Sequence, residues 1–292
     1  MATEVRRLSR SRIDTERWDA AVMTDCTPLP YGLSWWLDAV TDHNWQGLVV
    51  DDYRAVLPLP IKRMFGLLPT LTRAHFTQHC GPFGGIESGD TAELLTHLPR
   101  TVRLSLPLRP SLARVEVPRA YKLRERTNLL LDMEQPYPEI VSRFPGKLRA
   151  YLRKTAADEI EVADPKEVIT LSRQTLAGKP GITEATFKSL DRLIKVCRER
   201  RCGECYRLRE HGELLAIGFY PELAGRTINL VAASTERGRK RRGMSRLLAR
   251  LIEQRAGVAG NIFDFEGSDL SGVQQYFRKF GAQAVNYWQL ER

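Results

Sequence analysis

The densest group of charged side chains in this sequence lies in one short segment, residues 234–245. Five of the six residues from 237 to 242 are cations, and an amphipathic helix is expected to follow from residue 244. Because a helix N-terminus exposes unpaired N–H groups, it binds phosphate readily, and the glycines at 238 and 243 would let the backbone approach an anion. The segment predicts a diphosphate or nucleic-acid backbone site, with a solvated basic turn as the alternative. The residues assigned to binding are Arg239, Arg241, Arg242, Gly243, Met244 and Ser245.

Two carboxylates near the end of the sequence, Asp264 and Glu266, form a second candidate group. Two positions apart on a strand, they would share a face. Buried together, they would raise each other's pKa, and one could serve as a general base towards an amine. We take Glu266 as that candidate. The alternatives are that Glu266 pairs with Arg278, or that Gly267 and Ser268 cap the next helix.

Two further groups could bind an acceptor. His75 and Gln78 lie in a polar and aromatic stretch that ends in a glycine-rich turn, and such loops often line substrate clefts. Lys147 and Arg153 belong to an expected basic helix that could hold an anionic acceptor. The alternatives are a structural histidine in the first group and a solvated helix face in the second.

The overall composition narrows the functional classes. The 292 residues include 45 Lys and Arg against 35 Asp and Glu, a net charge of +10, which suits an anionic partner. No apolar run approaches the roughly 20 residues of a membrane span, and the first residues lack a secretory signal, so we expect a cytoplasmic protein. The five cysteines are odd in number, and Cys202 and Cys205 have zinc-knuckle spacing without a second pair. Free thiols and no metal are therefore expected.

The periodicity of the second half indicates which elements position these groups. Strands are expected at 205–209, 214–220 and 227–232, a helix at 244–252, a strand at 261–265, a helix at 270–280 and a strand at 284–290. The first half alternates short helical and strand-like pieces. The chain is thus expected to be α/β (α+β), with the basic segment joining a strand to a helix.

This order of elements resembles the GNAT acyltransferase superfamily. Residues 240–245, Lys-Arg-Arg-Gly-Met-Ser, are similar to the acyl-CoA diphosphate motif of that family, [Q/R]-x-x-G-x-[G/A], with the middle Gly kept and both ends replaced. Residues 263–268 and 272–282 resemble the Fem-like branch, within which the "FDFEGS" segment marks a bacterial subgroup. The resemblance implies two tandem GNAT-like domains, residues 1–130 and 131–292, each a mixed sheet flanked by helices.

The resemblance also implies an activity. It points to an N-acyltransferase that moves an acyl group from acyl-CoA, acetyl-CoA or longer, to a small-molecule or peptide amine bound in an interdomain cleft. In ordinary GNAT enzymes a Tyr about four residues before the final Gly of this helix protonates the leaving thiolate. Counting back from Gly281 reaches Phe277, and the adjacent Tyr276 is the catalytic candidate. The alternatives are Fem-like aminoacyl transfer from tRNA to a cell-wall precursor, and a non-catalytic RNA-binding or scaffold protein with a degenerate GNAT fold.

Overall fold

A computed structural model describes residues 3–64, 66–87, 89–110, 117–267 and 271–292 of the chain. The chain divides into two compact units, one of Met1–Arg126 with Asn286–Arg292 and one of Thr127–Val285. These units differ from two consecutive domains, because the last residues of the chain belong with the first unit. None of the described helices is both long and apolar enough to cross a membrane.

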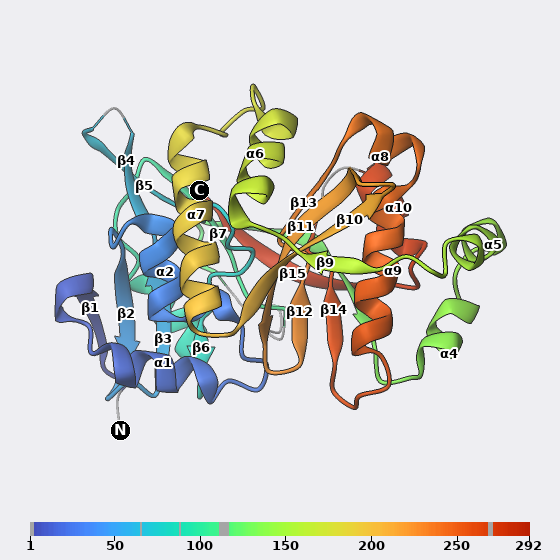
Figure 1. The fold of residues 1–292 in the computed structure, drawn as a ribbon. Helices are drawn as coiled ribbons and strands as arrows, with labels where there is room; N and C mark the ends of the chain where they lie inside the picture. Colours follow the sequence, from blue (N-terminus) through green and yellow to red (C-terminus); the bar gives the residue numbers. More distant parts are fainter. Residues whose placement is uncertain (1–2, 65, 88, 111–116, 268–270) are drawn as a thin grey trace. The chain divides into compact units, whose positions relative to one another are not determined.

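The first unit contains two groups of strands with short helices (Figure 1). One group has the order β1-β2-β3-β6 and is antiparallel throughout. The other joins β4, β5, β7 and the end of β15, with β5 and β7 parallel. The strands are β1 (Val5–Ser9), β2 (Gln46–Val50), β3 (Ala55–Leu59), β4 (Ile61–Met64), β5 (Leu68–Thr72), β6 (Phe83–Gly84), β7 (Arg103–Pro107) and β15 (Gln283–Glu291); the helices are α1 (Thr15–Met23), α2 (Ser34–Thr41) and α3 (Asp90–Thr96).

The core of the first unit forms where helices cover these strands. Helix α1 contacts β3 and β6, and α3 contacts β2. Strands β2 and β3 are almost entirely buried, as is usual for strands covered on both faces. Asp14 caps α1 by accepting from the amides of Glu16 and Arg17, which explains where that helix begins.

The second unit has a mixed sheet with the order β8-β14-β12-β11-β10-β9, and β13 also pairs with β11. Only β12 and β14 are parallel among the pairs described in this unit. The strands are β8 (Lys122–Asp132), β9 (Ile160–Val162), β10 (Gly203–Glu210), β11 (Glu213–Leu223), β12 (Arg226–Ile228), β13 (Val231–Ser234) and β14 (Ile262–Asp264); the helices are α4 (Tyr137–Ser142), α5 (Gly146–Lys154), α6 (Pro165–Leu176), α7 (Glu184–Glu199), α8 (Glu236–Lys240), α9 (Gly243–Arg255) and α10 (Ser271–Arg278).

The segment expected to be a basic loop is partly helical. Residues 236–240 form α8, and only Arg241 and Arg242 separate it from α9. Thr235 caps α8 because its hydroxyl accepts from the amide of Gly238 at 3.0 Å. The third expected strand is also divided, into β12 and β13, whereas the order of the other elements follows the prediction. Ser268 and Leu270, which the sequence placed at a helix start, lie outside the described residues.

Candidate functional site

Two neighbouring strands of the second unit separate after Ile228. Strand β12 runs parallel to β14 up to the pair Ile228–Asp264, and the amide of Asn229 donates to the carbonyl of Asp264 at 2.8 Å. Strand β13, which continues the same segment, pairs with β11 instead. Among the described residues, the pairing with β14 therefore ends at Asn229, and one edge of β13 has no strand partner.

The two carboxylates of the sequence prediction do not share a strand face. Strand β14 ends at Asp264, and Glu266 has a left-handed backbone with φ 58°. Asp264 is fully buried and accepts from Arg226 Nη1 at 2.7 Å and from the amide of Glu266 at 2.8 Å. Its charge is therefore matched within the sheet, and its role is to hold the turn. Glu266 is half-buried beside that turn, and its role as a base stays a prediction.

Tyr276 lies against the first turn of α9. Its hydroxyl is 2.9 Å from Ser245 Oγ, which joins α10 to the third residue of α9. Burial raises the pKa of Tyr276 to about 12, although the hydrogen bond with Ser245 acts in the opposite direction. Phe277, at the position where the family pattern has Tyr, stacks on Phe265 instead, with ring centres 4.7 Å apart. Tyr276, the residue before Phe277, thus supplies a tyrosine hydroxyl in this part of α10.

The N-terminus of α9 is open to an anion. Arg242 occupies the cap position with φ 48°, no side chain caps the helix, and the first turn contains no acidic residue. The amides of Gly243, Met244 and Ser245 precede the first intrahelical hydrogen bond, which Arg246 donates to the carbonyl of Arg242. Three N–H groups therefore remain available at the positive end of the helix dipole.

The glycines of this segment have a packing role that the sequence reasoning missed. A Cβ on Gly238 would collide with the carbonyl oxygen of Leu215, and one on Gly243 would lie 2.7 Å from Leu215 Cβ. Both glycines thus let α8 and α9 lie directly on β11. The prediction that Gly238 admits a ligand is wrong, because the backbone of β11 already occupies that space.

Several cations of the segment are held by carboxylates of the same unit. Glu210, at the end of β10, accepts from Arg241 at 2.9 and 3.0 Å and from Arg246 Nη1 at 2.8 Å. These bonds hold the pKa of Glu210 at about 2, with the bond from Arg241 as the largest cause. Lys240 pairs with Glu236 at 2.8 Å. Arg241, which the sequence assigned to binding, is therefore occupied within the protein.

Arg239 and Arg242 are the exposed cations that remain for a ligand. Arg239 donates to the carbonyl of Ser234 at 3.0 Å, and Arg242 lies over the ring of Tyr151, 4.9 Å from its centre. Neither forms a salt bridge within the described part of the chain. Both guanidinium groups belong to the residues just before the open end of α9.

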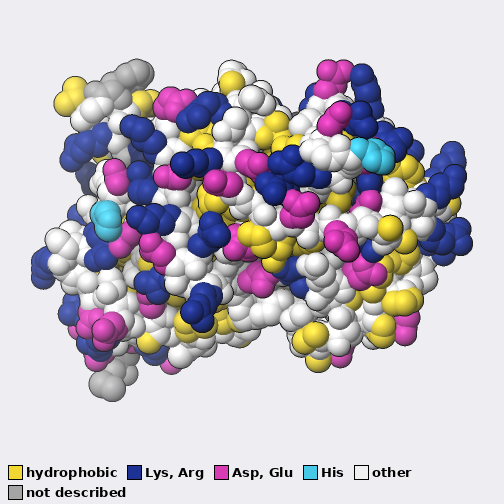
Figure 2. All heavy atoms as spheres, in the orientation of Figure 1, with side chains coloured by type: hydrophobic (Ala, Val, Ile, Leu, Met, Phe, Trp, Pro, Cys, Tyr) yellow, Lys and Arg dark blue, Asp and Glu magenta, His cyan; other side chains and the backbone are white. Residues whose placement is uncertain are grey.

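Helix α5 is hydrogen-bonded to the short link between α8 and α9. The hydroxyl of Tyr151 donates to the carbonyl of Arg241 at 2.6 Å. Lys147 and Lys154, four positions before and three after Tyr151, share its helix face and are exposed. Arg153 is also exposed but lies on another side of the helix. Lys and Arg side chains cover the edge of Figure 2 where Figure 1 has α5.

His75 and Gln78 belong to the first unit and lie in the loop between β5 and β6. Phe76, between them, has φ 59°, and its carbonyl accepts from Trp36 Nε1 at 3.1 Å. His75 is half-buried, whereas the side-chain amide of Gln78 is buried and has no hydrogen-bond partner among the described residues. A buried amide without a partner is costly, so the loop is compatible with a polar ligand. Its role in binding an acceptor stays a prediction.

The sequence reasoning overlooked four residues of this arrangement: Tyr151, Glu210, Arg226 and Arg246. Arg226 lies one residue before the strand expected at 227–232, so the pattern gave it no role, whereas the structure includes it in β12. Arg246 is buried on α9 and bonds both Asp158 and Glu210. Its partners lie far away in sequence, so no local pattern identified it.

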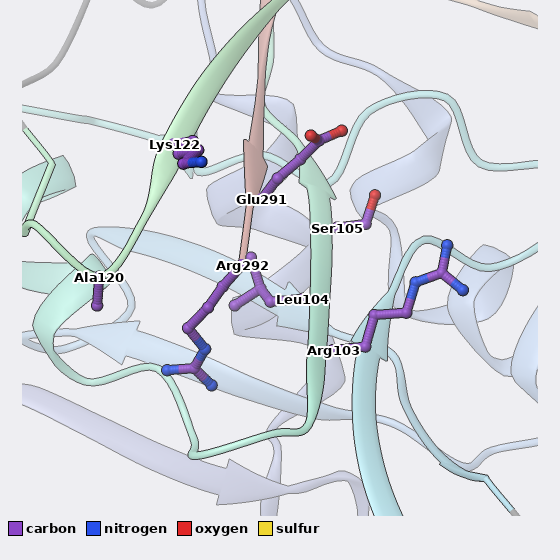
Figure 3. A pocket seen from close by; sticks show the side chains of 7 residues that line it. All are labelled: Arg103, Leu104, Ser105, Ala120, Lys122, Glu291 and Arg292. Carbon is purple, nitrogen blue, oxygen red and sulfur yellow. The ribbon is translucent and has the colours of Figure 1, made fainter.

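A cavity in the first unit is lined by none of these candidate residues. It has a volume of about 500 Å³ and is lined by Arg103, Leu104, Ser105, Ala120, Lys122, Glu291 and Arg292. Figure 3 shows that the guanidinium groups of Arg103 and Arg292 point in different directions. Arg292 donates to Thr101 and lies over Tyr121. Because the two guanidinium groups do not point towards a common position, we do not assign an anion-binding site to this cavity.

No protein-family model matches the sequence, and no curated protein matches it. Solved structures do match. FemX has 11% sequence identity and a TM-score of 0.68, with 99% of this chain and 97% of FemX covered. A tandem GNAT protein from the clavulanic acid biosynthesis pathway has 12% identity and a TM-score of 0.53, with 99% and 98% covered. The chain has a Fem-like tandem GNAT fold.

A third structure belongs to the same fold group. The C-terminal domain of a protein described as a lysylphosphatidylglycerol synthetase from Agrobacterium fabrum has 12% identity and a TM-score of 0.56, with 97% and 92% covered. At these identities the likeness concerns the fold alone, and a fold does not by itself determine the chemistry of a site. These matches confirm the fold class and the fold that the resemblance of residues 240–245, 263–268 and 272–282 implied.

Proposed function

We propose that the second unit is an N-acyltransferase site that moves an acyl group from acyl-CoA to an amine. The observation that carries the proposal is the Tyr276 hydroxyl, 2.9 Å from Ser245, at the uncapped start of α9. A hydrogen-bond donor, free helix amides and an unpaired strand edge thus occur in one part of the unit. An extended donor molecule with a diphosphate needs these same three features.

The donor diphosphate would bind the amides of Gly243, Met244 and Ser245. Arg242 and Arg239 would add charge from their exposed side chains, since the guanidinium group suits phosphate oxygens. These residues fit a diphosphate because no side chain caps the helix and the two arginines form no described salt bridge. No metal is needed by this arrangement, and the described residues contain no group of three His, Cys, Asp or Glu side chains that could hold one.

The chemical step would use Glu266 and Tyr276. The amine nitrogen attacks the thioester carbonyl carbon; a C–N bond forms, the C–S bond breaks, and the amine proton passes to Glu266 directly or through water. Tyr276 gives its phenolic proton to the leaving thiolate. Since the pKa of Tyr276 is about 12, the hydroxyl keeps its proton at neutral pH and is available as an acid.

Thermal unfolding with acetyl-CoA and longer acyl-CoAs tests the donor site. A ligand at a hundred times its dissociation constant adds about 2.7 kcal/mol, a shift of several degrees. We expect Arg242→Asn, combined with Arg239→Ala, to abolish that shift. Asn is chosen because it tolerates the left-handed backbone of Arg242. Lys240→Ala is the matched control, since Lys240 already pairs with Glu236. No shift with any acyl-CoA in the native protein would reject this donor.

The basic helix α5 supports a second candidate, aminoacyl-tRNA as the donor. Lys147 and Lys154 flank Tyr151, which is bonded to the carbonyl of Arg241, so their charges extend the cationic surface from the start of α9. A long polyanion would use more of this surface than a diphosphate. Under this hypothesis Lys147→Glu with Lys154→Glu weakens tRNA binding and reduces its salt dependence, whereas acyl-CoA gives no thermal shift. RNA binding without any acyl transfer would favour the non-catalytic alternative.

A further inference from the structure

Exposed large apolar side chains are concentrated at one place in the first unit. Seven such residues are exposed in the described part of the chain, and four of them lie on or beside the hairpin of β4 and β5. Their exposed fractions are Met64 41%, Leu67 77%, Leu68 43% and Val102 54%. Val102 joins the group because its amide donates to the carbonyl of Pro69 at 2.9 Å. An apolar group of this kind on a soluble surface usually marks an interaction site.

The strand register separates an apolar row from a cationic row on this hairpin. Met64 pairs with Leu68, and two positions further from the turn Lys62 pairs with Thr70, which in turn pairs with Arg103. Positions two apart on a strand face the same way, so Lys62 lies directly behind Met64 on that face. Figure 2 shows hydrophobic side chains at the upper left and Lys and Arg side chains below them.

The sequence around these cations contains few acidic residues, although Glu291, from β15, lines a cavity together with Arg103. Residues 53–86 and 94–115 contain neither Asp nor Glu. The opposite face of the same strands is ordinary core, since Leu71 and Leu104 are buried and Ile61 packs against them. The hairpin is therefore packed on the core at its base, and its exposed end carries apolar side chains with cationic side chains behind them.

We propose that the β4–β5 hairpin docks on an anionic lipid surface. Leu67, Leu68 and Met64 enter the boundary between headgroups and acyl chains, and Lys62 and Arg103, in the row behind Met64, bind the lipid phosphates. Charge complementarity favours this partner over a second copy of the chain. A two-fold contact through the same patch would place the cations of one copy against those of the other. The proposal is independent of the donor used by the second unit.

Co-sedimentation with vesicles tests the proposal. We expect the full chain to bind phosphatidylcholine vesicles that contain phosphatidylglycerol, and to bind pure phosphatidylcholine weakly. Leu67→Asp should reduce the partition coefficient by more than tenfold, and Lys62→Glu with Arg103→Glu by about fivefold per cation removed. The controls are Val258→Asp, an apolar residue outside the hairpin that is also exposed, at 52%, and Lys188→Glu, an exposed cation on α7.

The outcomes separate the lipid surface from other partners. Binding that Leu67→Asp leaves unchanged, or that Val258→Asp reduces equally, would reject the hairpin as the docking surface. Absence of binding to the anionic vesicles would reject the lipid. Sedimentation velocity of the native protein and Leu67→Asp provides the remaining check, because an oligomer that the substitution disperses would assign the patch to a second copy of the chain. Thermal unfolding of each variant confirms that it is folded.

Discussion

The setting of Tyr276 determines what its hydroxyl can do. The side chain packs against Phe280, with ring centres 5.6 Å apart, and its oxygen meets Ser245. Since burial raises the pKa of Tyr276 to about 12, the phenol stays protonated throughout the range in which an amine acceptor is reactive. A group of this kind acts as an acid and not as a base.

Replacement of that hydroxyl is the first prediction. We expect Tyr276→Phe to lower kcat by about a hundredfold, because a positioned general acid contributes at least that factor, and to leave KM for the donor nearly unchanged. The measurement is steady-state kinetics with the donor that gives a thermal shift. Ser245→Ala is the control, since it removes the partner and keeps the acid. Full kcat in Tyr276→Phe would exclude this residue as the acid.

Glu210 leads to a prediction about acid stability. Its pKa in the folded state, about 2, is below the ordinary value of 4.5, so the folded protein favours the charged form. The stabilisation is complete above pH 4.5 and is lost as the pH falls towards 2. Glu210→Gln should therefore cost about 2 kcal/mol at neutral pH, since it breaks hydrogen bonds between charged groups.

Urea unfolding at pH 7 and pH 3 measures this effect. The difference in unfolding free energy between the native protein and Glu210→Gln should be largest at pH 7 and smaller at pH 3. Glu236→Gln is the control, because the pair of Glu236 with Lys240 is exposed and contributes little. Equal losses in the two variants would mean that Glu210 does not hold Arg241 and Arg246 in solution.

At the scale of elements, the position of α8 and α9 depends on two glycines that face β11. A side chain at residue 238 would meet the carbonyl of Leu215, which is backbone and cannot rotate away. We expect Gly238→Ala to lower the unfolding free energy by about 3 kcal/mol, because overpacking forces the helix off the sheet. It should also weaken donor binding, since α8 leads directly into the start of α9.

Gly146→Ala is the matched control for that substitution. A Cβ at Gly146 meets nothing within 4 Å, and the residue begins α5, where Ala is the better helix former. This variant should be as stable as the native protein or slightly more so. Urea unfolding of both variants provides the comparison. If Gly238→Ala were as stable as Gly146→Ala, the close approach of α8 to β11 would not exist in solution.

These glycines also show where sequence reasoning ended. A Gly in a cationic segment at a helix start has the same local pattern whether it admits a phosphate or a neighbouring strand. Only the position of Leu215, distant in sequence, decides between them. The capping of α7 by Thr183, in contrast, was predictable because Thr183 and Thr186 bond each other's backbone within one turn. The alternation rule placed Asp264 and Glu266 on one face and was wrong because the strand ended between them.

At the scale of the molecule, the order of elements was predictable, whereas the assignment of β15 was not. Local periodicity showed a strand at 284–290 but not which sheet it would complete. In the structure Gln289, Leu290 and Glu291 pair with β7 of the first unit. Leu290 is fully buried in the same core as Leu104 and Leu106. Long-range pairing of this kind is decided by the whole core and leaves no local mark.

This pairing predicts which fragment folds. Residues 1–126 alone lack the strand that contributes Leu290, and loss of a buried Leu costs about 3 kcal/mol even when the strand remains. We expect that fragment to be largely unfolded, and the same fragment with residues 286–292 attached by a flexible Gly/Ser linker to show cooperative urea unfolding by circular dichroism. Leu290→Ala in the linked fragment is the control and should lower its stability by about 3 kcal/mol. If residues 1–126 were as stable alone as with the linked strand, the final residues would not belong to the core of this unit.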